Sequence, residues 1–486
     1  MIETIKKIVR RQEFANSVWN TVDVLFLPFV MLLVTPYFIT KLGEEQYGIW
    51  ILVNSIIASI GVLNLGIGDA AIKFISKYRA KKDEDSIFRI INSAYSINTA
   101  LAVIIASLGF VLSAALNKYN FLNLQTVNRT LAIDCIRLAA IVFGVKQIEQ
   151  LFLSIFKGFE RYDVSAFMSI ISKSILSGGQ IIIVVLGYGL VRLFQVSVIL
   201  SIIVLIFELY FIKYKFPRFN PFPGLQKQTL RELFSFSGYA WIQSILGILS
   251  TQIDKILVVS LAGPRFLAYY GLASMIGLQI HNFFTAASNW IFPRVSVKTE
   301  SSTSISHLYF KAQFLILIAG TVVFVSLLIF KDLIFGLWLG PEKYKEASEL
   351  ITIFLFNGLF MMITIVPYFT LLGSNNIKIS TFFMLLNTIL TYSLMYAAFL
   401  HFSVVGIAYG KLLSTILSVP IMLVYIHSKI LDSQNGIESF LIYIPVLMVC
   451  FAVYFSGTLS IVSIIIFLIF LFILFRAKIK LNHYEH

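Results

Sequence analysis

Residues 19–50 read WNTVDVLFLPFVMLLVTPYFITKLGEEQYGIW, and this stretch decides the fold class of the chain. The apolar run over 18–40 is long enough to cross a bilayer as one helix. It contains Asp23 and two prolines, which a spanning helix tolerates where neighbouring groups satisfy the freed carbonyls. A polar turn over 41–46 returns the chain into a second apolar run over 47–66. We therefore predict a transmembrane hairpin whose first helix carries an acid.

The composition excludes the soluble classes of protein. The chain has 486 residues, of which 58% are hydrophobic and 13% are charged, and its mean hydropathy is +0.88. Soluble domains carry about 25% charged residues, so we predict an all-α polytopic membrane protein. The net charge of +14 would suggest nucleic acid as the partner of a soluble chain. Here the basic residues lie mostly in short loops beside apolar runs, where membrane topology accounts for them, and we expect no nucleic-acid partner.

About fourteen apolar segments have the length of a transmembrane helix. Their approximate limits are 18–40, 47–66, 88–116, 130–156, 164–187, 190–212, 234–261, 266–290, 308–330, 347–372, 377–399, 403–427, 437–456 and 458–476. With a cytoplasmic N-terminus, about 25 lysines and arginines fall on the cytoplasmic side and about 10 on the other. This excess predicts that the N- and C-termini are both cytoplasmic.

A proline-rich connection over 213–232 is the longest predicted loop, and it separates two sets of spans. We predict three further regions, which are an N-terminal six-helix bundle over 1–212, a C-terminal six-helix bundle over 233–428, and two additional helices with a basic cytoplasmic tail over 429–486. A glycine-tyrosine pattern over 42–50 recurs loosely over 262–272. Secondary transporters are commonly built from such repeated bundles, with a central site between them.

Ionisable side chains inside spans are costly, and they mark sites, pathways or internal ion pairs. Asp23 is predicted either to bind a coupling cation, to pair with a basic residue, or only to hydrogen-bond a neighbouring helix. Lys146 and Glu149 are three residues apart on one helix face, so they either neutralise each other or line a cavity in which Lys146 attracts an anion. Lys173 has no acid at helical spacing in its own helix. We expect it in a cavity, facing water, a partner helix or an anionic ligand.

Asp254 and Lys255 lie late in the seventh predicted span, where they form either a gate or an interfacial pair. For Glu208, near the end of the sixth span, we expect snorkelling or pairing. The predicted site has two parts, a substrate-binding cationic cavity of Lys146, Lys173 and Lys255, and coupling or gating residues Asp23, Glu149 and Asp254. The sequence has no P-loop, no HExxH or GxSxG motif and no Cys/His ligand cluster, so we expect no enzyme, no metal site and no cofactor.

Several short motifs are spread along the chain. They are Asn20 with Pro36, Leu42-Gly43 with Tyr47-Gly48-Ile49-Trp50, Leu65-Gly66-Ile67-Gly68-Asp69-Ala70-Ala71, Lys157-Gly158-Phe159-Glu160-Arg161-Tyr162, Asp254-Lys255 with Tyr270-Gly271, and Gly406-Ile407-Ala408-Tyr409-Gly410. Together these residues resemble the polysaccharide or oligosaccharide flippase family, the Wzx-like branch of the multidrug/oligosaccharidyl-lipid/polysaccharide exporter superfamily. The resemblance covers nearly the whole chain. It implies two six-helix bundles in a V-shaped arrangement, with two C-terminal helices added, in the bacterial cell (inner) membrane.

The resemblance also implies a function. Such a flippase moves undecaprenyl-pyrophosphate-linked oligosaccharide repeat units, of O-antigen, capsule or exopolysaccharide, from the cytoplasmic to the outer leaflet by alternating access. Expected partners are membrane lipids and the glycan polymerase and glycosyltransferases of the same pathway, and the expected coupling ion is a proton or sodium. The alternatives left open are a cation-coupled multidrug exporter of the same superfamily and a membrane-embedded glycan polymerase or ligase. The sequence decides neither the sugar nor the coupling ion.

Overall fold

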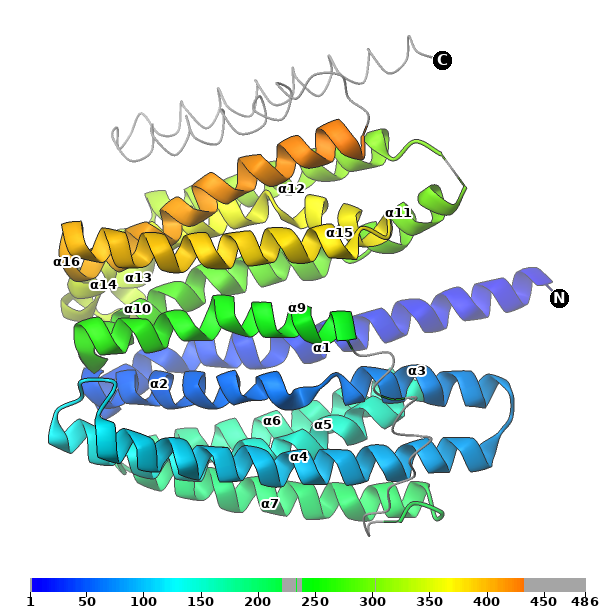
Figure 1. The fold of residues 1–486 in the computed structure, drawn as a ribbon, viewed down its shortest axis with the longest axis horizontal. Helices are drawn as coiled ribbons and strands as arrows, with labels where there is room; N and C mark the ends of the chain where they lie inside the picture. The colour runs from blue at the N-terminus through cyan, green and yellow to red at the C-terminus, as the bar shows by residue number, and fades with distance from the viewer. Residues whose placement is uncertain (1, 221–232, 234–237, 302, 432–486) are drawn as a thin grey trace. The chain divides into compact units, whose positions relative to one another are not determined.

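The computed structural model describes residues 2–220, 233, 238–301 and 303–431. In this part of the chain the regular structure consists of helices alone, so the predicted all-α fold is confirmed. The chain divides into two compact units, Met1–Ala268 and Tyr269–His486, and each is described by itself (Figure 1). The predicted linker over 213–232 and the predicted region over 429–486 fall mostly outside the described residues. The predicted bundle boundaries and the V-shaped arrangement stay predictions.

Unit 1 contains the first seven α-helices, a 3-10 turn and the region that leads into unit 2. The elements are α1 (Ile2–Leu42), α2 (Glu44–Ile60), η1 (Gly61–Asn64), α3 (Ile67–Ala80), α4 (Glu84–Tyr119), α5 (Thr126–Gly158), α6 (Tyr162–Val185), α7 (Leu190–Lys215), α9 (Gly238–Ile248), the π-helical η2 (Leu249–Ile253) and the first part of α10 (Asp254–Ala287). In Figure 1 these helices run alongside one another, with α5 packed against α2, α3, α4, α6 and α7, and α1 packed against α6.

Unit 2 begins within α10 and continues through a second set of helices. These are α11 (Ile291–Glu300), α12 (Ser306–Ile329), α13 (Lys331–Leu339), α14 (Pro341–Met362), α15 (Ile365–Gly373) and α16 (Ile377–Lys429). The backbone of α16 is interrupted at Phe402 and Ser403. A Cβ atom added to Gly406 would lie 2.1 Å from the carbonyl oxygen of Ala398, so only glycine permits this close approach of the two halves.

Among the described residues, nine helical stretches are long and apolar enough to span a membrane. Two of them, Trp241–Ala287 and Ile377–Lys429, are interrupted in the middle, so each contains two of the predicted segments. The long helix α5 overlaps another predicted segment. The predicted segments from 18–40 to 403–427 therefore all overlap described helices. The last two, 437–456 and 458–476, lie outside the described residues, so the total of fourteen stays a prediction.

The predicted hairpin at the start of the chain turns at Gly43. This glycine begins α2 with φ 81° and ψ 161°, a left-handed φ that other residues rarely adopt. Gly263 corresponds to Gly43 in the glycine-tyrosine pattern that recurs over 262–272. It has φ 81° and ψ 174° and is followed by Pro264. The tyrosines that follow, Tyr47 and Tyr270, are 2% and 0% exposed. The recurring glycine-tyrosine pattern therefore corresponds to a repeated local structure, in which a glycine turn leads into a helix with a buried tyrosine.

Small residues bring α4 and α5 into close contact. A Cβ atom on Gly109 of α4 would lie 2.2 Å from the Cβ of Ala140, and one on Gly144 of α5 would lie 2.8 Å from the carbonyl oxygen of Ala102. Helices in membranes associate through such contacts because lipid provides little hydrophobic driving force. The position of α5 therefore depends on these two glycines, and α5 carries two of the predicted site residues.

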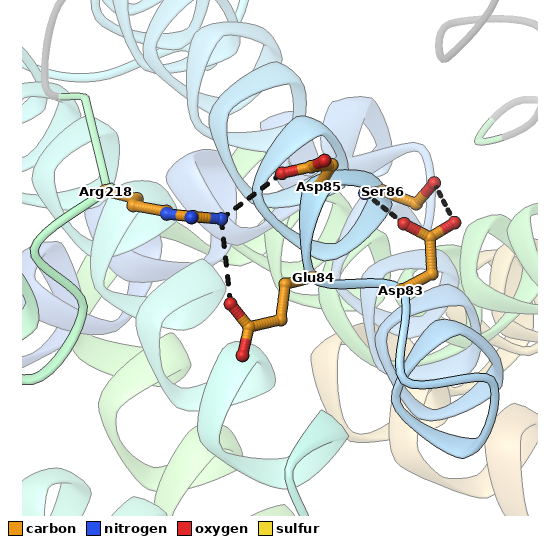
Figure 2. Close-up of polar contacts among 5 residues, drawn as sticks. All are labelled: Asp83, Glu84, Asp85, Ser86 and Arg218. Carbon is orange, nitrogen blue, oxygen red and sulfur yellow. Dashed lines mark hydrogen bonds and ion pairs between the residues drawn. The ribbon is translucent and has the colours of Figure 1, made fainter.

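The start of α4 is fixed by a cap. Asp83 Oδ1 accepts a hydrogen bond from the Ser86 N–H at 3.0 Å, and Asp83 Oδ2 accepts one from the Ser86 hydroxyl at 2.6 Å (Figure 2). These bonds hold the pKa of the Asp83 carboxyl below its usual value. Arg218, just after α7, lies 3.6 Å from Glu84 and 3.2 Å from Asp85, so it links the end of α7 to the start of α4. These pairs are exposed and contribute little stability.

Replacing Gly144 with Ala tests the contact between α4 and α5. We expect Gly144→Ala to lower the apparent Tm of the purified full-length protein, with a loss of about 1–3 kcal/mol from overpacking. Gly178 is the matched control, because it is helical and no atom lies within 4 Å of its ideal Cβ position. Gly178→Ala should leave Tm unchanged or raise it, since alanine has the higher helix propensity. A Gly144→Ala protein as stable as the wild type would contradict the close packing.

The Asp83 cap predicts a pH dependence of stability. Because the folded-state pKa is depressed, the cap stabilises the protein above the unfolded Asp pKa of about 3.9 and is lost as pH falls through the folded-state value. We expect Asp83→Ala to lower Tm at neutral pH and the difference from wild type to shrink in acid. Asp83→Asn keeps an acceptor without the charge and should lie between the two. A Tm difference that is independent of pH would argue against the capping role of the carboxylate.

Candidate functional site

An ion pair joins the first and fifth predicted spans inside unit 1. Lys173 Nζ on α6 lies 2.6 Å from Asp23 Oδ1 on α1, and it also donates to the Asp23 carbonyl oxygen at 2.7 Å. The Asp23 side chain is 10% exposed and that of Lys173 is 21% exposed. The structure thus places two of the predicted site residues together, although they are 150 residues apart in sequence. Of the surroundings left open for Lys173, the structure shows a partner helix.

This pair has a direct energetic consequence for the packing of α1 on α6. A single charge is costly inside a membrane, and breaking a buried pair by removing one partner typically costs about 3–5 kcal/mol. The attraction between the two charges therefore opposes separation of α1 from α6. An arrangement that separates these helices needs water, an ion or an anionic ligand to replace the lost partner.

Two further buried acids lie on α5 and α7, helices that pack against each other. Glu149 is 8% exposed and Glu208 is 6% exposed, and both Glu208 oxygens lack a hydrogen-bond partner in the described residues. Within the described residues, Lys146 and Glu149 form no ion pair, so the predicted neutralisation along one helix face does not occur there as a direct contact.

The interruption between α2 and α3 places polar groups inside unit 1. Leu65 and Gly66 have φ values of 38° and 64°, and these left-handed residues end the 3-10 turn and start α3. The Gln147 amide on α5 donates to Asn64 Oδ1 at 3.0 Å and to Asn98 Oδ1 on α4 at 2.8 Å. An interrupted helix in a transporter is a frequent place for a substrate or ion site. These hydrogen bonds therefore connect the interruption between α2 and α3 to the neighbouring helices α4 and α5.

A cavity of about 430 Å³ lies beside the interruption, between this segment and the α9–η2 region of unit 1. Its lining residues are Gly61, Val62, Asn64, Leu65, Gly66, Asp69, Trp241, Ser244, Gly247, Ile248 and Thr251. The Trp241 indole donates to the Val62 carbonyl oxygen at 2.6 Å, which fixes the ring at the cavity wall. The cavity combines an aromatic ring with hydroxyl, amide and carboxylate groups, a set that suits a ligand with both polar and apolar faces.

The predicted residues Asp254 and Lys255 lie next to this cavity. The Lys255 ammonium donates to the carbonyl oxygen of Thr251, a lining residue, at 2.6 Å, and to Gln252 at 3.2 Å. Asp254 is 1% exposed, and its Oδ1 accepts the Lys255 backbone N–H at 2.9 Å. The π-helical turn of η2 comes directly before them, and such turns are frequent at functional sites. Of the three predicted cations, Lys255 is the one bonded to a cavity-lining residue.

Sequence reasoning missed part of this site. It expected Glu208 to snorkel or pair, whereas the structure buries both of its oxygens. It also did not single out Asn64, Asn98 and Trp241. A usable signal was present, because glycines at 61, 66 and 68 bracket Asn64 within an apolar run, which is unusual in a continuous helix.

The interrupted helices, the internal ion pair and the polar cavity are the features of a multi-span membrane transport protein. The profile of the family described as "Polysaccharide biosynthesis protein" matches residues 14–298, and the chain belongs to this family. The resemblance inferred from the short motifs is thus confirmed. A protein of Shigella flexneri assigned as an O-antigen transporter is 19% identical over 367 residues, which are 75% of this chain and 86% of that protein.

Solved structures share the fold. The lipid II flippase MurJ in an inward closed conformation has a TM-score of 0.69 and 15% identity, over 96% of this chain and 100% of that one. An inward-facing multidrug resistance MATE family transporter of the MOP superfamily has a TM-score of 0.67 and 15% identity, over 85% of this chain and 99% of that one. These solved structures are of transporters and flippases, and this chain shares their fold.

Variants of the ion pair test its role in packing. Asp23→Asn and Lys173→Met each leave one buried charge without its partner. Each should therefore reduce the free energy of unfolding by about 3–5 kcal/mol and lower the Tm of the full-length protein. The double variant removes both charges and should recover much of the loss. The exposed pair of Arg161 and Asp163, 3.0 Å apart, is the matched control, and its neutralisation should change Tm little.

Two results would contradict this role of the ion pair. One is single variants that are as stable as the wild type. The other is a double variant that is no more stable than the worse of the two singles.

Proposed function

We propose that this protein is a flippase that carries lipid-linked oligosaccharides across the bacterial inner membrane. Membership of the polysaccharide biosynthesis family carries the proposal, because the match over residues 14–298 includes both the ion pair and the cavity. The expected cargo is an undecaprenyl-pyrophosphate-linked repeat unit of O-antigen, capsule or exopolysaccharide. It moves from the cytoplasmic to the outer leaflet by alternating access. Both termini are proposed to be cytoplasmic, as the distribution of basic loop residues favours.

The cavity supports this proposal through its chemistry. A pyrophosphate and a sugar chain cannot cross hydrocarbon unaided, because their polar groups would lose their hydration. Sugar hydroxyls can bond to Asn64 and Ser244, while the apolar face of a sugar ring packs on an aromatic ring such as Trp241. We propose that the Lys255 ammonium, which is bonded to the carbonyl oxygen of the lining residue Thr251, exchanges this acceptor for a phosphate oxygen.

Of the other two predicted cations, Lys173 has a competing partner. Lys173 is held by Asp23, so a phosphate must displace that carboxylate before it can bind there. Lys146 lies on α5, three residues before the buried Glu149. Phosphate binding by these two lysines stays a prediction. We propose that Asp23 and Asp254 act in gating, since each is buried and contacts a lysine of the predicted cavity.

Two alternatives predict different outcomes in the same assay. A cation-coupled multidrug exporter of the same superfamily would move organic cations and leave lipid-linked glycans in place. A glycan polymerase or ligase would change the length or the attachment of the glycan. Relatives that are transporters favour movement over bond formation. Partnership with the polymerase and glycosyltransferases of the pathway remains part of the proposal.

Flipping can be measured directly with the purified full-length protein in proteoliposomes. A fluorescent undecaprenyl-pyrophosphate oligosaccharide is incorporated in both leaflets, and a membrane-impermeant reductant bleaches the outer one. We expect the protein to make the inner pool accessible, and we expect Trp241→Ala and Lys255→Ala to slow this about tenfold or more, since loss of a stacking or charged contact removes about 1–3 kcal/mol. Trp19→Ala and Lys345→Ala, both exposed and outside the cavity lining, are the matched controls.

Three outcomes would contradict the proposal. The first is a protected inner pool in the presence of folded protein, and the second is export of cationic dyes without movement of the glycolipid. The third is a glycan of altered length, which would favour the enzymatic alternative. Equal rates for the cavity variants and the wild type would contradict the cavity assignment while leaving the flippase activity intact.

A further inference from the structure

The short helix α11 connects two helices of unit 2 at one of their ends. It follows α10, which ends at Ala287, and precedes α12, which begins at Ser306, and both belong to stretches long and apolar enough to span a membrane. It packs against α15 (Figure 1). A Cβ atom on Gly373, the last residue of α15, would lie 2.7 Å from the Cβ of Val295, so this contact is close. A helix between two spans lies at the membrane surface, near the lipid headgroups.

One face of α11 combines exposed apolar side chains with a cation. Trp290, Arg294 and Val297 follow one another at intervals of four and three residues, and positions with this spacing share one face of a helix. Trp290 is 39% exposed, Val297 is 64% exposed, and Arg294 is exposed as well. The buried face carries Ile291 and Val295. Exposed apolar side chains beside a basic one are typical of a helix that contacts the membrane interface.

The Arg294 guanidinium is stacked on the Trp290 ring. Its central carbon lies 4.9 Å from the ring centroid, which is a cation–π contact. In the described part of the chain no carboxylate forms an ion pair with Arg294. The stack holds the plane of the guanidinium, and a planar guanidinium binds a phosphate through two parallel hydrogen bonds. Arg294 is therefore a pre-oriented binding group for a phosphate.

The end of unit 2 that carries α11 is basic. The Ser306 hydroxyl at the start of α12 donates to the Leu431 carbonyl oxygen after α16, at 3.5 Å, and α16 begins directly after α15. These helix ends therefore lie together with α11. Among the described residues there, one acid, Glu300, stands against five basic residues, which are Arg294, Lys298, Lys311, Lys378 and Lys429. The segment over 331–349, at the other end of α12, carries three lysines and four acids. An excess of basic residues on one side attracts an anionic lipid surface.

We propose that the exposed face of α11 binds the headgroup of an anionic phospholipid. The Arg294 guanidinium donates to the phosphate, and Trp290 and Val297 contact the apolar part of the lipid below the headgroup. The basic residues around α11 select anionic over zwitterionic phospholipids, because a zwitterionic headgroup has no net charge for them to attract. The apolar side chains beside Arg294 favour a phospholipid over the diphosphate of the proposed cargo, which carries a polar glycan. This site does not depend on the proposed function.

Tryptophan fluorescence measures which lipid lies next to Trp290 in vesicles that contain the full-length protein. Bromine atoms on the acyl chains quench a tryptophan that they contact, and the difference between the wild type and Trp290→Phe isolates the Trp290 signal. Vesicles of phosphatidylcholine receive a minor fraction of either brominated phosphatidylglycerol or brominated phosphatidylcholine. We expect the anionic lipid to quench Trp290 more strongly. Arg294→Gln should reduce this preference about fivefold, as expected for the loss of one basic residue near an anionic surface.

Arg192→Gln is the matched control, because Arg192 is also an exposed arginine over an aromatic ring, 6.0 Å from the centroid of Tyr188. It should leave the preference unchanged, and Arg294→Lys, which keeps the charge without the planar group, should retain part of it. Tm and gel filtration establish that each variant is folded. Native mass spectra give a second measure that needs no tryptophan variant, and in them Arg294→Gln should retain less bound phosphatidylglycerol than the wild type.

Three results would overturn the proposed lipid site. The first is equal quenching of wild-type Trp290 by the two brominated lipids, and the second is an unchanged preference in Arg294→Gln. The third is a loss of quenching when a lipid-linked oligosaccharide is added, under conditions where unbrominated phosphatidylglycerol does not compete. That result would assign this face of α11 to the cargo instead.

Discussion

A charge inside hydrocarbon needs an opposite charge, a hydrogen bond or a proton, and this constraint shapes unit 1. It accounts for the 2.6 Å contact between Lys173 and Asp23, which ties α6 to α1. It also bears on Glu149 of α5 and Glu208 of α7, two buried acids on helices that pack against each other. The two groups share no helix, so each can change its state without directly displacing the other.

The positions of most helices along the chain were predictable, because a membrane-spanning helix requires a long run of apolar residues. Long apolar runs mark the spans, and the glycine at 43 marks the first turn, where φ is 81°. The short helices α3, α11 and α13 were not predicted. They are too short or too polar to show as spans, and α3 starts directly after Leu65 and Gly66, which take left-handed conformations. Such a local break depends on tertiary packing more than on composition.

The charged residues of the site were predictable from the sequence, but the residues that they contact were not. Asp23 and Lys173 stood out because each is a charge within an apolar run, but no spacing rule joins residues 150 positions apart. Lys146 and Glu149 suggested a pair by helical spacing, and among the described residues they form no ion pair. The partner of a charge inside a bundle usually lies on another helix, and periodicity along one helix carries no information about it.

The contact between Trp241 and the Val62 carbonyl oxygen has an evolutionary consequence. The acceptor belongs to the backbone of the 3-10 turn, so every residue type at position 62 would supply it. Selection can therefore change the side chains there freely while the indole keeps its anchor, provided that the interruption of the helix persists. Relatives that differ at most positions would then retain the same cavity wall, and a comparison of side chains alone would underestimate how much of the recognition surface they have in common.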